Sequence, residues 1–261
     1  MNQKLLISIK SLDELNLPAD GYVLGYHKYT LFAEHYFSYD DLLKIKDKKK
    51  VYLLLNALIN ENRIKEVEDE LIKLIDLEVN FIVSDFGLLN LLKKHVHGNE
   101  IILEPYTLIS NELDYQTYQE TFNVGLGISP FIKEEDLISM SKLEGSFIYA
   151  LGYLPLYQSH RKIIDIYKDF HHLEAEGEQL YLKEEYRDDL YPILENKEGS
   201  SVFKSSPISL LSSLDKYQNA SYIYLDFMFI DINKSLVLNN LCNQEKLKEL
   251  ELQMGVKDET Y

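Results

Sequence analysis

The chain has 261 residues, of which 46% are hydrophobic, and a formal net charge of −16. This length and apolar content suffice for one large α/β domain, whereas the negative charge opposes broad nucleic-acid binding, because neutralising phosphates needs a surface rich in Lys and Arg. The single cysteine, Cys242, excludes an internal disulfide and a metal site built from several thiolates.

The amino-terminal stretch "MNQKLLISIKSLDEL" contains an apolar run of only five residues, which is shorter than the apolar region of a signal peptide. No apolar run along the chain approaches the ~18 residues that a membrane span requires. From these two features we expect a soluble protein of the cytoplasm that has no membrane partner.

A strand-then-helix alternation runs along the chain. Helical patterns fill most gaps between the candidate strands, and the clearest places Ile64, Val67, Leu71, Leu74 and Ile75 on one face. Such alternation indicates parallel strands joined by crossover helices. The eight candidate strands are "LLISI" (5–9), "YVLGY" (22–26), "VYLLL" (51–55), "FIVS" (81–84), "EIIL" (100–103), "FNVGLGI" (122–128), "SFIYA" (146–150) and "YIYLDF" (222–227).

Eight strand-helix units favour a TIM-like (βα)-barrel over the alternative, an open doubly wound sheet. The first strand of a doubly wound sheet is normally followed by a glycine-rich phosphate loop, and "ISIKSLDEL" contains no glycine. Residues 179–204 read as extra strands, "QLYLKE", "YPILEN" and "SVFKS", and form a small β insertion before the last barrel strand. We predict a single barrel domain over residues 1–261, and the sequence leaves open whether the barrel is closed, distorted or incomplete.

Polar residues that directly follow predicted strands are the first candidates for a functional site, because barrel enzymes carry their chemistry in loops at the carboxyl ends of the strands. Helix capping is an alternative role for Asp85 and Asn111, since Asp and Asn are preferred N-caps whatever the function. Glu104 and Asp226 are harder to explain as caps. The strand-end candidates are Asn56, Ser84, Asp85, Glu104, Ser129, the segment 152–161 and Asp226.

The basic pair His160–Arg161 stands out in an acidic chain. We expect both residues to converge with Asp85, Glu104 and Asp226 at one mouth of the barrel. The pair would then act either as a clamp for a phosphate or carboxylate, or as an ion-pair partner of the carboxylates.

Two further candidates lie on the same segment. Tyr153 is a candidate for lining a pocket, although most of the 20 tyrosines should be structural. Ser159 precedes Lys162 at a Ser-x-x-Lys spacing, but the same spacing recurs elsewhere in the chain and its partner motifs are absent. The catalytic residues therefore stay undetermined, and the seven histidines show no metal-ligand spacing.

Five segments carry a family resemblance over nearly the whole chain: "VYLLLNALINENRI", "VNFIVSDFGLLNLLKK", "EPYTLISN", "LGYLPLYQSHRKII" and "YRDDLYPILENKEGSSVF". Together they resemble the collagenase-like peptidase family, family U32 of the peptidase classification. The family's pattern at the seventh strand is His-Gly-x-x-Cys-x-x-x-Ser-Gly-x-Cys. Gly152, Ser159 and Arg161 fit it, whereas Leu151 stands in place of the histidine and Pro155 and Lys162 in place of the cysteines.

The other family motifs match in part. Asp85 fits an Asp-x-Gly turn and Asn111 fits the asparagine after the fifth strand, but Glu104 stands where a Ser/Thr-Gln pair is usual. After the sixth strand, Pro130 and Phe131 replace the expected Arg-Glu.

The resemblance implies two functions. Relatives take part in proteolysis, in oxygen-independent hydroxylation, or in modification of transfer and ribosomal RNA, and several hold an iron-sulfur cluster on four cysteine thiolates. With Pro155 and Lys162 at two ligand places, we expect no cluster and no other cofactor. The chain is then either a cluster-free enzyme or enzyme subunit acting on a peptide or an RNA base, or a non-catalytic partner of a cysteine-bearing paralogue in RNA-base modification.

Overall fold

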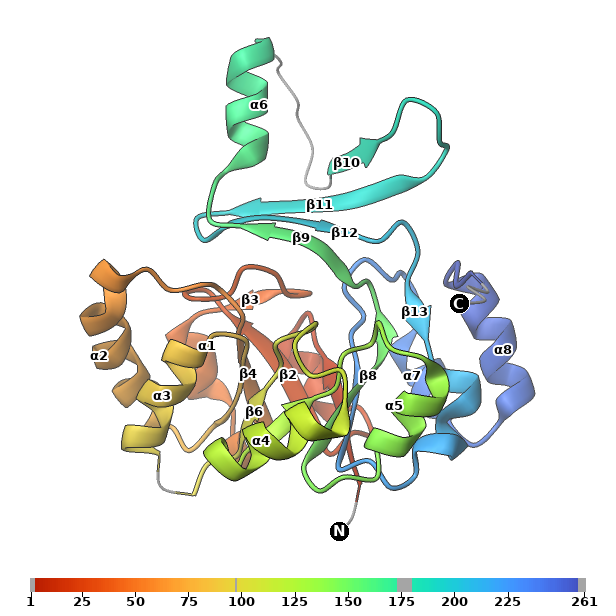
Figure 1. Ribbon diagram of the computed structural model, residues 1–261, viewed down its shortest axis with the longest axis horizontal. Helices are drawn as coiled ribbons and strands as arrows, with labels where there is room; N and C mark the ends of the chain where they lie inside the picture. The colour runs from red at the N-terminus through yellow and green to blue at the C-terminus, as the bar shows by residue number, and fades with distance from the viewer. Residues whose placement is uncertain (1–2, 97, 173–179, 258–261) are drawn as a thin grey trace.

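In the computed structural model, eight parallel strands close into a barrel (Figure 1). The structure describes residues 3–96, 98–172 and 180–257. Closure follows from β1, which pairs in parallel with both the last and the second barrel strand. The prediction of a TIM-like barrel is confirmed, and all eight candidate stretches supply its strands. They are β1 (Lys4–Ser8), β2 (Gly21–Tyr26), β4 (Val51–Leu55), β5 (Asn80–Val83), β6 (Ile101–Leu103), β7 (Gly125–Gly127), β8 (Ser146–Gly152) and β14 (Tyr222–Leu225).

Helices surround the barrel, and several begin where the sequence provides a cap. The side chain of Asp85 accepts a hydrogen bond from the Leu88 amide at 2.9 Å, and Asn111 does the same for Asp114 at 2.9 Å. No helix in the described residues is long and apolar enough to cross a membrane. The surrounding helices are α1 (Tyr39–Lys44), α2 (Ile64–Ile75), α3 (Phe86–His95), α4 (Glu112–Phe122), α5 (Glu134–Met140), α7 (Lys234–Leu238) and α8 (Gln244–Gln253). The short strand β3 (Tyr36–Phe37) pairs with β2. The 3-10 helices are η1 (Leu12–Asn16), η2 (Lys48–Lys50), η3 (Glu61–Arg63) and η4 (Leu211–Tyr217).

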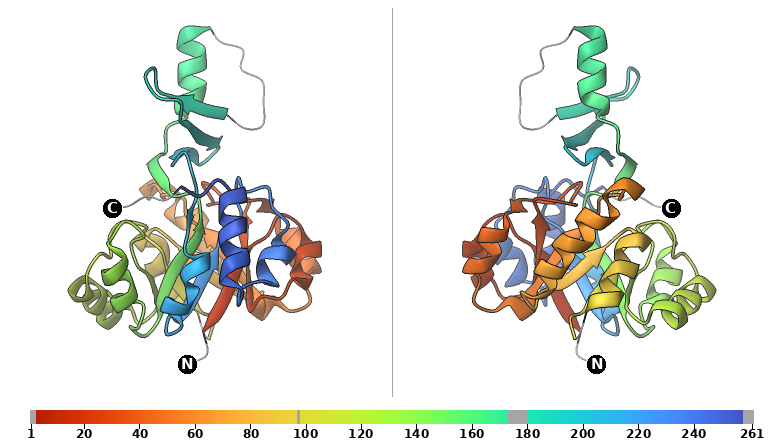
Figure 2. Two further views of the ribbon diagram at one scale, coloured as in Figure 1. Left: turned by 90° about the vertical axis from the view of Figure 1, so that its right-hand side faces the viewer. Right: turned by 90° about the vertical axis from the view of Figure 1, so that its left-hand side faces the viewer.

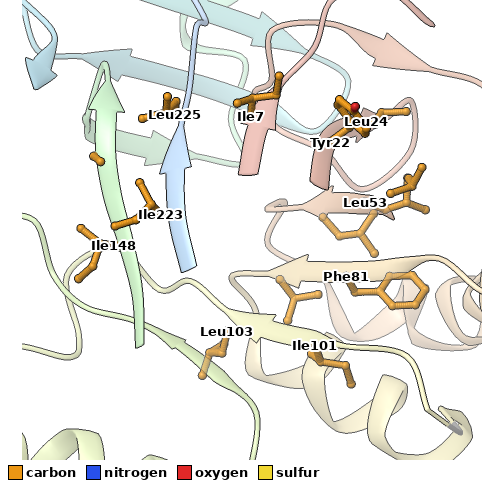
Figure 3. Close-up of a cluster of buried hydrophobic side chains, with 14 of the residues drawn as sticks. Ile7, Tyr22, Leu24, Leu53, Phe81, Ile101, Leu103, Ile148, Ile223 and Leu225 are labelled. Atoms are coloured by element: carbon orange, nitrogen blue, oxygen red, sulfur yellow. The ribbon is translucent and has the colours of Figure 1, made fainter. Parts of the chain in front are cut away.

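The core has two layers because successive strand residues point to opposite sides. The outer layer packs strands against helices, and Figure 3 shows part of it, including Ile7, Leu53 and Phe81. The inner layer fills the barrel with larger rings such as Tyr52 and Tyr224. Glycines face these rings where space is short: a Cβ on Gly21 would lie 2.6 Å from the Tyr52 ring.

A second, four-stranded antiparallel sheet stands over the carboxyl ends of the barrel strands (Figures 1 and 2). We call the whole excursion between β8 and β13 the insertion. It is longer than the predicted 179–204, because the chain leaves the barrel at once after β8. Its elements are β9 (Pro155–Ser159), α6 (Ile163–His171), β10 (Leu180–Lys183), β11 (Leu190–Asn196) and β12 (Gly199–Phe203), and β13 (Ile208–Ser209) returns to pair with β8.

Candidate functional site

Two of the predicted carboxylates are buried near the carboxyl ends of the barrel strands. Glu104 follows β6 and is 2% exposed, and Asp226 follows β14 and is 3% exposed. Both act on the same side chain: burial raises the pKa of the Tyr106 hydroxyl, and Glu104 and Asp226 raise it further. The structure thus places both carboxyls near the same tyrosine.

Asp226 is held by hydrogen bonds on both of its oxygens. Its Oδ2 accepts from the Tyr149 hydroxyl at 2.9 Å, and its Oδ1 accepts from the Met228 amide at 3.0 Å. Burial raises the pKa of this carboxyl to about 6, although the two hydrogen bonds oppose the rise. Gly152 makes the approach possible, since its φ is +139° and a Cβ there would lie 2.5 Å from the Tyr149 hydroxyl.

Only one of the two carboxyl oxygens of Glu104 has a hydrogen-bond partner. Its Oε1 accepts from the Tyr106 amide at 2.9 Å, whereas its Oε2 is buried and has no hydrogen-bond partner in the described residues. The carboxyl lies in the space left by Gly127 on the adjacent strand, because a Cβ at Gly127 would lie 1.8 Å from Oε2. Burial raises the pKa of Glu104 to about 8, so this carboxyl is mostly protonated at neutral pH. The hydroxyl of Ser84, after the neighbouring β5, is also buried and lacks a partner within the described part of the chain.

Three tyrosines enclose the two acids. Tyr106, Tyr149 and Tyr224 are all buried, and desolvation, with the nearby carboxylates, raises the pKa of each hydroxyl well above 10. The rings of Tyr149 and Tyr224 meet edge to face at 5.4 Å. The prediction did not include Tyr149 and Tyr224. The alternation of strand residues could have found Tyr224, since it lies two positions before Asp226 and so faces the same side.

An aromatic plug closes the mouth of the barrel above this site. It consists of Phe32, Phe203 and Phe229, which come from the loop after β2, from β12 and from the loop after β14. Phe203 is fully buried and contacts both partners, with ring centroids 5.1 Å from Phe32 and 5.2 Å from Phe229. Tyr106 extends the contact, with its ring 5.7 Å from that of Phe32. The insertion therefore supplies the central ring of the cover.

Polar contacts fix the insertion to the barrel beside the plug. Glu198, in the β11–β12 turn, forms an ion pair with Arg63 at 2.6 Å, and only 2% of its side chain is exposed. The Asn196 side-chain amide donates to the carbonyls of Thr30 and Leu31 at 3.1 and 2.9 Å. Tyr29 joins the group, because Arg63 lies over its ring at 5.3 Å.

Strained backbone gathers at the same end of the molecule. Tyr29, Tyr106 and Phe229 all have φ near +60°, a region that bulky residues rarely adopt. Each lies in a loop that follows a barrel strand. Such strain persists only where surrounding contacts impose it, and it occurs often at binding sites.

Asn56 holds the loop after β2. It follows β4 and is 1% exposed. Its side chain accepts from the Leu31 amide at 2.8 Å and donates to the Phe32 carbonyl at 3.0 Å, so it shapes the loop that carries the plug.

The expected convergence of His160 and Arg161 with the carboxylates is wrong. Both residues are exposed on the insertion, between β9 and α6, and Asp85 serves as a helix cap. The reason is that the chain after β8 continues as β9, whose five residues carry it roughly 16 Å along the second sheet. Ser159 lies at the end of β9, where its hydroxyl accepts from the Arg161 amide at 3.0 Å.

Tyr153 stays near the barrel mouth and packs edge to face against Phe229 at 5.7 Å. A second buried cluster, centred on Lys234, joins the first and last strands. Its ammonium group contacts Glu14 and Glu34 at 2.7 Å each and the Ser8 carbonyl at 3.1 Å. Because every charge in this cluster has a partner, we assign it a structural role.

The residues present do not fit an iron-sulfur cluster. Pro155 begins β9, whereas Lys162 lies beyond the strand at the start of α6, where its ammonium pairs with Asp165 at 3.3 Å. Cys242 is a free, exposed cysteine between α7 and α8. Within the described ranges, no three His, Cys, Asp or Glu side chains are grouped to hold a metal ion. A cluster needs several thiolates, and this chain has one.

Comparison with known proteins gives one match. Residues 14–124, which run from before β2 to just after α4, match the family model described as Peptidase family U32. No curated protein and no solved structure matches the chain. The matched part contains four barrel strands and Glu104, and it agrees with the resemblance read from the sequence. The match covers less than half of the chain, and it supports membership of peptidase family U32.

Proposed function

We propose that this chain is a binding subunit of the U32 family, which acts with a second protein and carries out no proteolysis of its own. The observation that carries the proposal is the aromatic plug, because it fills the end of the barrel at which barrel enzymes place their chemistry. The plug is anchored by the buried Glu198–Arg63 ion pair, so the cover is a fixed part of the fold. The replacement of the family's histidine and cysteines by Leu151, Pro155 and Lys162 supports the same conclusion.

The insertion carries the surface through which we expect the second protein to bind. Ten of the eighteen large hydrophobic side chains that are exposed in the described residues lie between Leu156 and Leu190. On α6, Ile166, Tyr167 and Phe170 are 58%, 57% and 79% exposed, and the helix buries none of its residues. Exposed apolar side chains gathered in this way are typical of protein interfaces, where aromatic residues are enriched.

The second sheet also supports a protein-binding surface on the insertion. Antiparallel sheets with one face on a core usually present polar residues on the other face. Here Leu194 and Phe203 pack toward the barrel, yet the opposite face is also apolar. Residues paired across the strands share that face, with Ile193 beside Leu180 and Val202, and Val202 beside Tyr157. We call this face, together with the apolar side chains of α6, the apolar surface of the insertion.

The occupant that fits this surface is a different protein, and a family paralogue that carries the cysteines is the candidate we favour. A second copy of this chain would bring together two molecules with a formal charge of −16 each, and that repulsion opposes self-association. Nucleic acid is disfavoured for the same reason. An apolar protein surface with a basic border suits the acidic chain better.

Phe170→Ser is the test of this proposal. The partner is identified by co-purification from the native cell with mass spectrometry and is then produced separately for a binding assay. We expect Phe170→Ser to weaken the complex about thirtyfold, as truncation of a buried aromatic anchor does. Leu252→Ser is the matched control, since Leu252 on α8 is 76% exposed, and it should leave affinity unchanged. Equal affinity for Phe170→Ser and wild type, or peptide turnover by the purified chain alone, would refute the proposal.

A second candidate function, an enzyme acting on a peptide or an RNA base, is favoured by Glu104 alone. A buried carboxyl whose pKa is raised to about 8 could donate a proton to a substrate. Turnover of such a substrate by the chain with its partner, lost in Glu104→Gln, would favour the enzyme over the binding subunit.

A further inference from the structure

We infer that Arg161, in the turn before α6, forms an ion pair with a carboxylate of the partner protein, at the edge of the apolar contact that α6 makes. The inference rests on the proposed function and deepens it, because it names the chemistry that the partner must place opposite this turn. It follows from three observations: a guanidinium without an ion pair, a backbone held in place beneath it, and exposed apolar side chains on either side of it.

The first observation is that the guanidinium of Arg161 is free. The chain has three arginines, and the other two are paired within it. Arg63 contacts the Glu198 carboxylate at 2.6 Å, and Arg187 contacts the Glu184 carboxylate at 3.4 Å. Arg161 is exposed and takes part in no ion pair among the described residues.

Acids close to Arg161 in the fold have other partners. The Asp165 carboxylate pairs with Lys162 at 3.3 Å. The Glu195 carboxylate accepts from the first backbone amides of α6, those of Ile164 and Asp165, at 2.8 and 3.0 Å. The insertion therefore presents a cation that its own acids leave unpaired.

The second observation is that polar contacts fix the backbone of this exposed turn. The Arg161 amide donates to the Ser159 hydroxyl at 3.0 Å, and the Arg161 carbonyl accepts from the Ser200 hydroxyl at 2.7 Å. Ser200 is buried in β12. Gly199 allows β12 to approach the turn, because its φ is +136° and a Cβ there would lie 1.9 Å from the Ser159 carbonyl oxygen. A side chain on a fixed backbone has less freedom to lose when it binds.

The third observation is the apolar setting of the turn. β9, which precedes it, exposes Leu156 and Tyr157, and α6, which follows it, exposes Ile163 and Ile166. Figures 1 and 2 show α6 standing away from the barrel, so the turn and the helix are presented together. Arginine is enriched at protein interfaces alongside such aromatic and apolar groups. Its planar guanidinium can bind both oxygens of one carboxylate.

A carboxylate of a protein fits this turn better than the phosphates of a nucleic acid. Nucleic acid would bring a row of negative charges toward a chain with a formal charge of −16, and a single guanidinium neutralises little of that row. A protein can place one carboxylate opposite Arg161 and still carry apolar and basic groups elsewhere on its surface. Such a pattern complements the local cation and the acidic remainder of the chain together.

Charge reversal at Arg161 tests the inference with the full chain and the partner identified and purified as described above. We expect Arg161→Glu to melt as wild type does and to weaken the complex about tenfold at low salt. The loss should shrink at high salt, because ions screen an exposed pair, whereas the loss in Phe170→Ser should persist. Lys46→Glu is the matched control, since Lys46 is exposed between α1 and η2 and the change in net charge is the same. It should leave the affinity unchanged.

Crosslinking with a carbodiimide locates the carboxylate that faces the turn. In Arg161→Lys the substituted side chain carries a primary amine, which condenses with an adjacent carboxyl to form an amide bond while the carbodiimide takes up the water. We expect mass spectrometry to find a peptide containing position 161 linked to a single acidic residue of the partner.

The outcomes separate this inference from the proposed function. If Phe170→Ser weakens the complex while Arg161→Glu and Lys46→Glu have equal affinities, the binding subunit stands and the ion pair is refuted. A loss in Arg161→Glu that is equal at low and high salt, or no crosslink from Arg161→Lys in an intact complex, would also overturn the ion pair. Wild-type affinity in Phe170→Ser, or the absence of any co-purifying protein, would refute the proposed function and the inference with it. If Arg161→Glu does not fold, Arg161→Met replaces it, with a salt-dependent loss again expected.

Discussion

Replacing Glu104 with glutamine should change how the free energy of unfolding depends on pH. Burial raises the pKa of Glu104 from its ordinary 4.5 to about 8. The folded chain therefore keeps this proton at pH values where the unfolded chain has lost it. The stabilising contribution is complete below pH 4.5 and is lost as the pH rises through 8.

The size of the effect follows from the same shift. Each pH unit between the two pKa values is worth about 1.4 kcal/mol, so from about pH 5.5 to 8 wild type should lose about 3 kcal/mol through this group. Glutamine does not titrate and keeps the acceptor for the Tyr106 amide, so the variant should lack this loss. The raised pKa of Asp226 is common to both proteins and cancels in their difference.

Urea unfolding followed by circular dichroism across this pH range provides the measurement. The difference between wild type and Glu104→Gln should change by about 3 kcal/mol, with the variant gaining relative stability at high pH. The exposed control Glu120→Gln should run parallel to wild type. A difference between wild type and Glu104→Gln that stays constant within about 0.5 kcal/mol would show that Glu104 is ionised or hydrated in the folded protein, and would refute the reasoning.

Four further predictions concern the insertion and the family motif. Arg63→Met leaves the buried Glu198 without its cation and should lower the stability of the insertion by about 3 kcal/mol. Amide hydrogen exchange should become faster in the β11–β12 turn while exchange in β4 stays unchanged, and equal protection of the turn in variant and wild type would contradict the prediction. Arg161→Met should shift stability by less than about 0.5 kcal/mol in a thermal melt, because Arg161 is exposed, and a larger loss would argue for a buried partner. The anaerobically purified chain should contain no stoichiometric iron or sulfide, and the broad visible absorption of a cluster in the isolated chain would contradict this prediction. Ser159→Ala should leave any gelatin turnover unchanged, because its hydroxyl accepts from a backbone amide and the adjacent His160 is exposed; loss of turnover in a stably folded variant would prove a catalytic role.

The sequence by itself determined the strand-helix units and the helix caps, because these depend on neighbours along the chain. Short apolar runs identified all eight strands, and the apolar face from Ile64 to Ile75 became α2. Asp85 and Asn111 cap helices through contacts only three residues away. The positions of Glu104 and Asp226 near the barrel mouth could be predicted, since a barrel brings the carboxyl ends of its strands to one end.

Only the tertiary structure decided the course of the segment after β8. The sequence suggested a site loop around His160 and Arg161, but β9 pairs with β12, a strand more than forty positions later, and this pairing draws the segment out of the barrel. No local pattern encodes which distant strand a short apolar stretch will join, because strand pairing depends on contacts between residues far apart in the chain. The same pairing places Phe203 against Phe32 at the barrel mouth.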